Sequence, residues 1–101
     1  MAITVTDRPQ LSRFELYDGE DLAGFSEYHR HADEIAFLHT EVAPAFAGRG
    51  LGTRLGLAAL DAARDQGLAV LPYCPFIRHL IREHPGYLDL VPVAQRVKFD
   101  L

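Results

Sequence analysis

The chain has 101 residues, of which 49% are hydrophobic and 24% are charged, and its net charge is −4. This size and balance are typical of a soluble globular protein, so we expect residues 1–101 to form a single domain without a nucleic-acid surface, which would need clustered Lys and Arg. No apolar run reaches the roughly 18 residues of a membrane span, the N-terminus does not resemble a signal peptide, and a lone Cys74 excludes an internal disulfide, so we expect a cytoplasmic protein without membrane contact.

The first part of the chain predicts an antiparallel meander of four strands. Alternating apolar and polar residues indicate strands at residues 3–6, 11–17, 22–28 and 34–42. The pair Asp18-Gly19 is typical of a tight hairpin turn between the second and third of these strands. In the fourth strand, alternation would place Ile35, Phe37 and His39 on one face, and Ala36, Leu38 and Thr40 on the other.

A glycine-rich turn with Gly48, Gly50 and Gly52 follows, and it leads into a helix that we expect to end at Gly67. The apolar stripe that would face the sheet consists of Leu51, Leu55, Ala58, Ala59 and Ala62. Glycine permits positive φ and close approach of a ligand, and a helix N-terminus offers unpaired N–H groups and a partial positive charge. With Arg49 and Arg54 beside these donors, the turn predicts an anion site.

The anion would be a pyrophosphate-sized group held by the consecutive amides of residues 48–53. A Walker A loop needs a lysine that this turn lacks, and a dinucleotide fingerprint needs a glycine where Leu55 stands. Coenzyme A fits the description that remains.

The second part of the chain predicts a crossover back to the sheet. Residues 68–74 form a short apolar strand, which we expect to lie parallel to residues 34–42, with the glycine turn and Cys74 at the same edge of the sheet. Pro75 suits the first position of a second helix, whose buried side would be Ile77, Leu80 and Ile81. Residues 84–87 predict a type II turn that ends this helix, and residues 90–97 predict a last strand.

These motifs resemble a known family. The string from Gly48 to Leu55, Gly-Arg-Gly-Leu-Gly-Thr-Arg-Leu, preceded by the strand His39-Thr-Glu-Val, is similar to the acetyl-CoA-binding motif of the GNAT superfamily of N-acetyltransferases. The strings Tyr73-Cys-Pro-Phe and His84-Pro-Gly-Tyr are similar to its minimal branch of small acetyltransferase-like proteins, and the resemblance covers about residues 12–91. It implies an α/β fold of the α+β type: a mostly antiparallel sheet with a central β-loop-α-β unit, a splayed parallel strand pair and about two main helices.

The resemblance also implies where acetyl-CoA, the cosubstrate, would bind. Its pyrophosphate would lie on the amides of the glycine turn, and its pantetheine arm would pair with the backbone near Val42 in the gap between the two parallel strands. The residues implied to bind it are Val42, Gly48, Arg49, Gly50, Leu51, Gly52, Thr53, Arg54, Pro75, Phe76 and Arg78. Ala47 stands where the superfamily motif has Gln or Arg, a departure that removes one side-chain contact and leaves the amides in place. Arg78 could instead belong with Arg82 to a solvated helix face.

Four residues are candidates for the chemistry of acetyl transfer to an amine. His39 or Glu41 could act as the base, and Tyr87 could protonate the leaving thiolate. Cys74 offers a second route through an acetyl-cysteine, since a helix N-terminus favours the thiolate, but direct transfer is preferred because that route only exchanges one thioester for another. Each of these residues also has a purely structural interpretation, as a packed, hydrogen-bonded or exposed side chain.

Two other functions stay open from the sequence. The chain could be a coenzyme A or acyl-CoA binding module with little turnover, or an interaction protein whose glycine turn grips another anion. The acceptor amine and the oligomeric state cannot be inferred from the sequence. His29 and His31 belong to no ligand set with recognised spacing, so no metal is expected.

Overall fold

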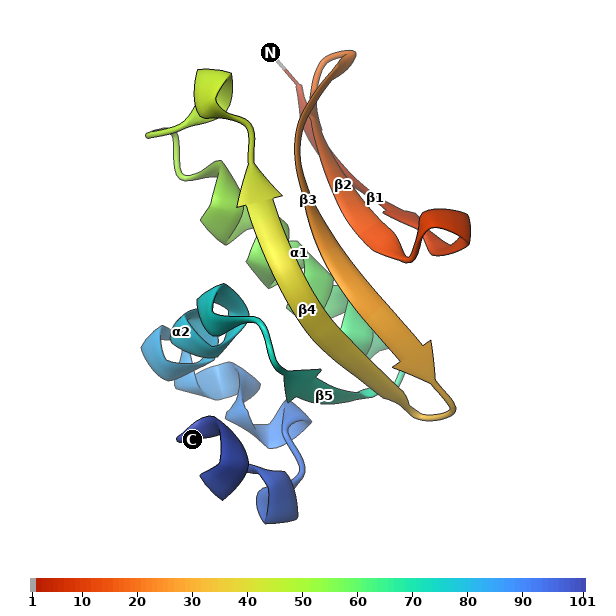
Figure 1. Cartoon of the computed structure of the whole chain (residues 1–101), viewed down its shortest axis with the longest axis vertical. Coiled ribbons are helices and arrows are strands. Elements are labelled where there is room, and N and C mark those ends of the chain that lie inside the picture. The colour runs from red at the N-terminus through yellow and green to blue at the C-terminus, as the bar shows by residue number, and fades with distance from the viewer. Residues whose placement is uncertain (1) are drawn as a thin grey trace.

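The computed structural model describes residues 2–101 as a five-stranded sheet with two α-helices and several short 3-10 turns (Figure 1). The strands follow one another across the sheet in chain order: β1 (Ile3–Arg8), β2 (Arg13–Asp18), β3 (Asp21–His31), β4 (Glu34–Val42) and β5 (Ala69–Pro72). Successive strands from β1 to β4 are antiparallel, whereas β5 is parallel to β4. The predicted α+β fold, with its antiparallel meander and one parallel pair, is confirmed.

Tight turns set the register of the meander. Asp18 pairs with Asp21 across a two-residue turn in which Gly19 has a φ of +61°, a conformation that glycine adopts without strain. His31 likewise pairs with Glu34, and there Ala32 takes a φ of +52°. The strands β2, β3 and β4 are therefore joined by two-residue turns rather than by long loops.

The helix α1 (Leu51–Asp65) connects β4 to β5 and lies behind the sheet in Figure 1. Its fully buried side is Leu51, Leu55, Gly56, Ala59, Leu60 and Ala63, so the predicted stripe was partly wrong: Ala58 and Ala62 are only half-buried. Gly67, with a φ of +68°, ends the helix as predicted, and the Leu68 N–H donates to the Ala63 carbonyl at 2.9 Å. Burial of each large apolar side chain in this layer contributes about 1.5–3 kcal/mol.

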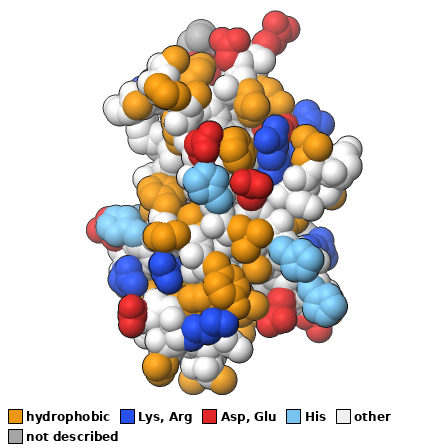
Figure 2. All heavy atoms as spheres, in the orientation of Figure 1, with side chains coloured by type: hydrophobic (Ala, Val, Ile, Leu, Met, Phe, Trp, Pro, Cys, Tyr) orange, Lys and Arg blue, Asp and Glu red, His pale blue; other side chains and the backbone are white. Residues whose placement is uncertain are grey.

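The second helix, α2 (Pro75–Glu83), begins at Pro75 and buries Ile77, Leu80 and Ile81, as predicted. It packs against α1 at Gly56, where an added Cβ would lie 2.3 Å from Leu80 Cδ1. The helix α2 thus packs beside α1, which lies behind the sheet in Figure 1. The opposite face of the sheet, turned toward the viewer in Figures 1 and 2, is left uncovered by α1.

The predictions for the C-terminal part were wrong. Residues 90–97 do not form a strand; the chain makes 3-10 turns at Pro85–Leu90, Val93–Gln95 and Val97–Phe99. Pro92 has no N–H to donate to a ladder, and Arg96 donates instead to the Val91 carbonyl at 3.0 Å. The type II turn at residues 84–87 is also absent, because Gly86 lacks the positive φ that such a turn requires.

Candidate functional site

The glycine turn ends in a helix N-terminus whose donors carry no side-chain cap. Gly48 and Gly50 have φ values of +80° and +71°, and a Cβ added to either would meet no atom within 4 Å. The Arg54 N–H donates to the Gly50 carbonyl at 3.2 Å, so the amides of residues 51–53 precede the first helical hydrogen bond. The first turn of α1 has no acidic residue. The turn therefore presents backbone donors to the solvent without a nearby helix carboxylate.

Two adjoining cavities run from this turn along β4, and together we call them the turn groove. A cavity of about 310 Å³ lies at the turn and another of about 220 Å³ reaches Thr40 and Glu41; both are lined by Val42, Gly52 and Phe76. The remaining lining residues at the turn are Phe46, Ala47, Gly48, Gly50, Leu51 and Thr53. Gly52 keeps the groove open, because an added Cβ would lie 3.3 Å from Phe76 Cζ and 3.5 Å from Val42 Cγ2.

The edge of β4 is open where the groove meets it. The strands β4 and β5 pair only as far as Phe37 and Pro72, and the Cys74 N–H then donates to the Phe37 carbonyl at 2.8 Å. Since the Ala43 N–H donates to the Ala23 carbonyl in β3, alternation directs the Val42 N–H away from β3 and toward the open side. An extended ligand could pair with this edge as another strand would.

A bulge in β4 corrects the predicted faces of the strand. Tyr28 pairs with Phe37 but Glu27 pairs with His39, so Leu38 is an extra residue and the alternation reverses after it. His39 is consequently exposed on the open sheet face, not on the core face with Ile35 and Phe37 as predicted. Its Nε2 lies 3.0 Å from Oε1 of Glu41, so the two candidate bases form one pair.

The same bulge turns Thr40 inward, toward Cys74. The Cys74 side chain is buried, with 2% of its surface exposed, and its thiol donates to Thr40 Oγ1 at 3.5 Å. Thr40 Oγ1 is in turn 2.9 Å from Oγ of the fully buried Ser26. The sequence analysis missed the hydroxyls of Thr40 and Ser26. Regular alternation placed Thr40 on the opposite face, and no local pattern predicts the bulge.

The three arginines implied to bind coenzyme A differ in their surroundings. Arg49 donates from Nη1 to Oδ2 of the buried Asp18 at 2.9 Å, and so ties the glycine turn to the end of β2. The other oxygen, Asp18 Oδ1, is buried without a hydrogen-bond partner among the described residues. Arg54 is exposed in the first turn of α1, and Arg78 is half-buried on α2. Arg82 donates to the carbonyls of residues 99 and 100, which places it against the C-terminal turns.

Tyr87 does not join these residues. Its hydroxyl donates to Asp61 Oδ1 at 2.7 Å, and Asp61 lies ten residues into α1, about 15 Å along the helix from its N-terminus. The hydrogen bond to Asp61, together with burial, raises the pKa of Tyr87 and makes its proton less available. The predicted role of Tyr87 in protonating the thiolate therefore has no geometric support.

Residues 2–101 contain neither a cluster of metal-ligand side chains nor a helix that could span a membrane. No three His, Cys, Asp or Glu side chains in that range gather as metal ligands would. Within the same range, no helix combines the length and the apolar character needed to cross a bilayer.

Comparison with known proteins identifies the family. The family described as GCN5-related N-acetyl-transferase matches residues 13–90. The chain belongs to this family. Protein NATD1 of Bos taurus and of Xenopus tropicalis are each 35% identical to it over 51 residues, which is 50% of this chain and 45% and 47% of those proteins. The match thus spans about half the length of these relatives.

Two solved structures resemble the fold. A GCN5-like protein from Staphylococcus aureus superimposes with a TM-score of 0.67 at 24% identity, over 88% of this chain and 87% of that one. Ard1 from Thermoplasma volcanium superimposes with a TM-score of 0.50 at 24% identity, over 56% of this chain and 39% of its own. At these identities the likeness concerns the fold alone.

Proposed function

We propose that this member of the GCN5-related N-acetyltransferase family transfers the acetyl group of acetyl-CoA to an amine. The observation that carries the proposal is the continuity of the turn groove, which joins the free amides of the glycine turn to the open edge of β4. The family generally uses acetyl-CoA. At the far end of the groove lie the His39–Glu41 pair on one side of β4 and the Cys74–Thr40 contact on the other.

The residues of the turn groove suit coenzyme A. The amides of residues 48–53 would hold the diphosphate, with Arg54 and Arg78 as the nearby positive charges. The Val42 backbone would pair with the pantetheine arm, and Pro75 and Phe76, at the start of α2, would flank it. Arg49 would contribute by holding the glycine turn in place through its ion pair with Asp18.

Within this site, His39 would be the base and Glu41 the residue that positions it. If Glu41 accepts a hydrogen bond from Nε2–H of His39, then Nδ1 is free to take a proton from the attacking amine. The amine nitrogen forms a bond to the thioester carbon, the carbon–sulfur bond breaks, and the electron pair leaves with the thiolate. The Val42 N–H would polarise the carbonyl, and a donor of this kind contributes about 3–4 kcal/mol to lowering the barrier.

Direct transfer is favoured over an acetyl-cysteine route. Cys74 is buried and its thiol is engaged with Thr40, whereas His39 and Glu41 are exposed on the face that an acceptor can reach. A gain of one acetyl group on Cys74, measured by mass spectrometry after incubation with acetyl-CoA alone, would overturn direct transfer.

The experiment that tests the function combines binding with turnover. Titration with coenzyme A should shift the amide NMR signals of residues 48–53, and a panel of amines should yield acetylated product. His39→Gln should lower kcat about a hundredfold or more and leave coenzyme A binding intact. The matched control is His79→Gln, since His79 forms an exposed pair with Glu83 at 2.8 Å on α2, away from the groove. Binding without product for any amine would favour a coenzyme A binding module instead.

A further inference from the structure

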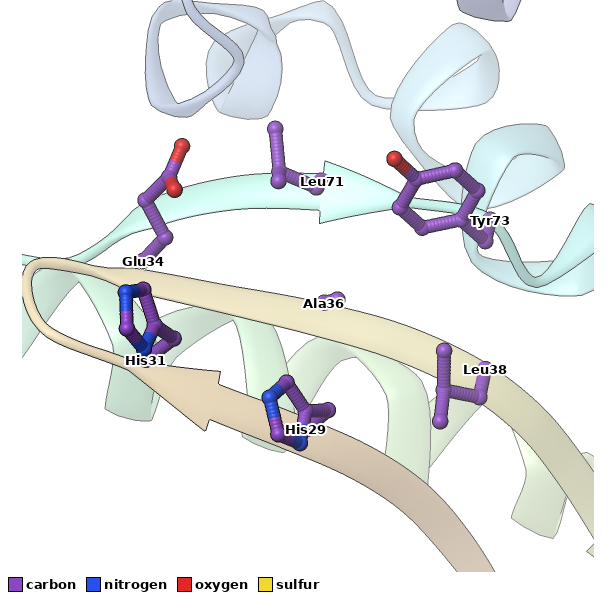
Figure 3. A pocket seen from close by; sticks show the side chains of 7 residues that line it. All are labelled: His29, His31, Glu34, Ala36, Leu38, Leu71 and Tyr73. Atoms are coloured by element: carbon purple, nitrogen blue, oxygen red, sulfur yellow. The ribbon is translucent and has the colours of Figure 1, made fainter.

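A second groove lies on the open face of the sheet, opposite α1. It has a volume of about 570 Å³, larger than either part of the turn groove. Figure 3 shows its floor at Ala36 on β4, with Leu38 further along the strand. Leu71 on β5 and Tyr73, just after the end of β5, form one wall. His29 and His31 on β3 form the other wall. We call it the sheet-face groove.

The groove exists because a small residue stands between larger neighbours. Ala36 projects only a methyl group from the centre of the sheet, where it pairs with His29 on one side and Leu71 on the other. The wall at β5 is formed by Leu71 and Tyr73 and the wall at β3 by the two histidines, while Glu34 at one end brings a carboxylate. Within residues 2–101 this carboxylate makes no ion pair or side-chain hydrogen bond, unlike those of Glu15 and Asp18. The groove therefore combines an apolar floor and one largely apolar wall with one unpaired negative charge at its end.

The other end of the groove meets the proposed reaction centre. Leu38 and Tyr73 are the first residues beyond the last β4–β5 pair, and Cys74 follows Tyr73 directly. The two grooves are thus lined by neighbouring residues of β4, Leu38 in the sheet-face groove and Thr40 in the turn groove. At this end, Lys98 Nζ lies 2.7 Å from the Tyr73 hydroxyl and 4.7 Å from the centre of its ring.

From this arrangement we propose that the sheet-face groove binds the acceptor, and that the acceptor is a long aliphatic diamine. The inference rests on the proposed function, because it supplies the amine that function requires. Four residues of strand separate Glu34 from Leu38, about 13 Å, which sets the distance between a protonated amine at Glu34 and a reacting amine at the gap. The methylenes between them would contact Ala36, Leu38 and Leu71.

The charges at the two ends support a diamine over a simple alkylamine. Glu34 stabilises a protonated amine at the far end, whereas the positive charge of Lys98 near the gap disfavours a second proton there. The nitrogen that must attack as a neutral amine is thus at the end where protonation is disfavoured. The net charge of −4 also favours the approach of a dication.

The test compares two acceptors of equal length that differ in one charge, diaminooctane and octylamine. Glu34→Gln should lower kcat/KM for diaminooctane about two- to fivefold and leave octylamine unchanged. Ala36→Leu fills the floor of the groove and should lower kcat/KM for both amines at least tenfold, with unchanged affinity for coenzyme A. Glu20→Gln, in the exposed β2–β3 turn, is the matched control and should change nothing. An unaltered preference between the two amines in Glu34→Gln would overturn the diamine assignment.

A binding measurement separates this inference from the proposed function. Without acetyl-CoA, diaminooctane should shift the amide NMR signals of residues 34–38 and 71, and Glu34→Gln should require a several-fold higher diaminooctane concentration for the same shifts. If the wild-type protein shows the shifts but acetylates no amine, the groove stands and the proposed function fails. If acetylation occurs without such shifts and is insensitive to Ala36→Leu, the proposed function stands and the groove is not the acceptor site.

Discussion

Gly56 in the middle of α1 should be intolerant of a single added methyl group. In Gly56→Ala the new Cβ would lie 2.3 Å from Leu80 Cδ1 and 3.3 Å from Ile77 Cδ1, whereas carbon atoms in contact prefer about 3.5–4.0 Å. Both neighbours are buried, with 3% and 0% of their surfaces exposed, so the Leu80 side chain must find another rotamer in a packed interior or α2 must move away from α1. Overpacking of this kind costs about 1–3 kcal/mol, and the better helix propensity of alanine returns about 0.5–1 kcal/mol.

The net loss of about 1 kcal/mol corresponds to a fall in Tm of about 4–8 °C for a chain of this size. Coenzyme A affinity should fall as well, because Phe76, which lies 3.6 Å from the added Cβ, lines the turn groove. Thermal unfolding and calorimetric titration measure the two effects. Gly86→Ala is the control: its Cβ meets nothing within 4 Å and its φ is not positive, so it should raise stability by about 0.4–1 kcal/mol. A Gly56→Ala protein as stable as the wild type would refute the packing argument.

Three further substitutions test separate parts of the structure. Gly50→Ala forces a φ of +71° on a residue with a Cβ, which should cost about 1–2 kcal/mol in urea unfolding and weaken coenzyme A binding in calorimetry. Burial raises the pKa of Glu15, but hydrogen bonds from Tyr17, Arg13 and Arg8 outweigh it, so the net pKa lies below the usual 4.5. Glu15 therefore stabilises the fold above pH 4.5 and loses this contribution as the pH falls through its lowered pKa. The free energy of unfolding, measured across that pH range, should depend less steeply on pH in Glu15→Gln than in the wild type. Equal slopes for the two proteins would contradict this account. Tyr87→Phe should leave kcat unchanged and reduce stability by about 1 kcal/mol, whereas a large loss of turnover would restore its predicted role.

The elements that sequence reasoning predicted well are those with a local signal. The bounds of β4 at residues 34–42, the glycine turn before α1 and Pro75 at the start of α2 all follow from periodicity or from residues with restricted backbone angles. The strand predicted in the C-terminal part was wrong because a contact with a distant residue, and no local signal, sets the structure there. Val93 and Val97 look like strand residues but are 74% and 88% exposed, and their chain segment is held by Phe99, whose ring packs against Tyr73 at 5.0 Å. That contact joins residues 26 positions apart, so it cannot be predicted from the local sequence pattern.

The site was predictable in its backbone and less so in its side chains. The free amides of a glycine-rich turn before a helix can be predicted from composition alone, because only glycine takes these φ values without strain. The partners of Arg49 and Tyr87 could not be inferred, since Asp18 and Asp61 reach them from other elements. Residues such as Thr40 were missed because their facing depends on the strand register.

The extra residue at Leu38 is what gives β4 two different functional faces. Without it, regular alternation would bury His39 beneath α1 beside Phe37, where an imidazole needs a hydrogen-bond partner, and would expose Thr40 to solvent. With it, His39 and Glu41 share the open face with the sheet-face groove, while Thr40 meets Cys74 and Ser26 inside. The bulge also falls where β5 leaves β4, so the reversal of facing and the opening of the strand pair occur at the same residues. Under the proposed function, cofactor and acceptor would therefore approach one short segment of β4 from opposite sides of the sheet.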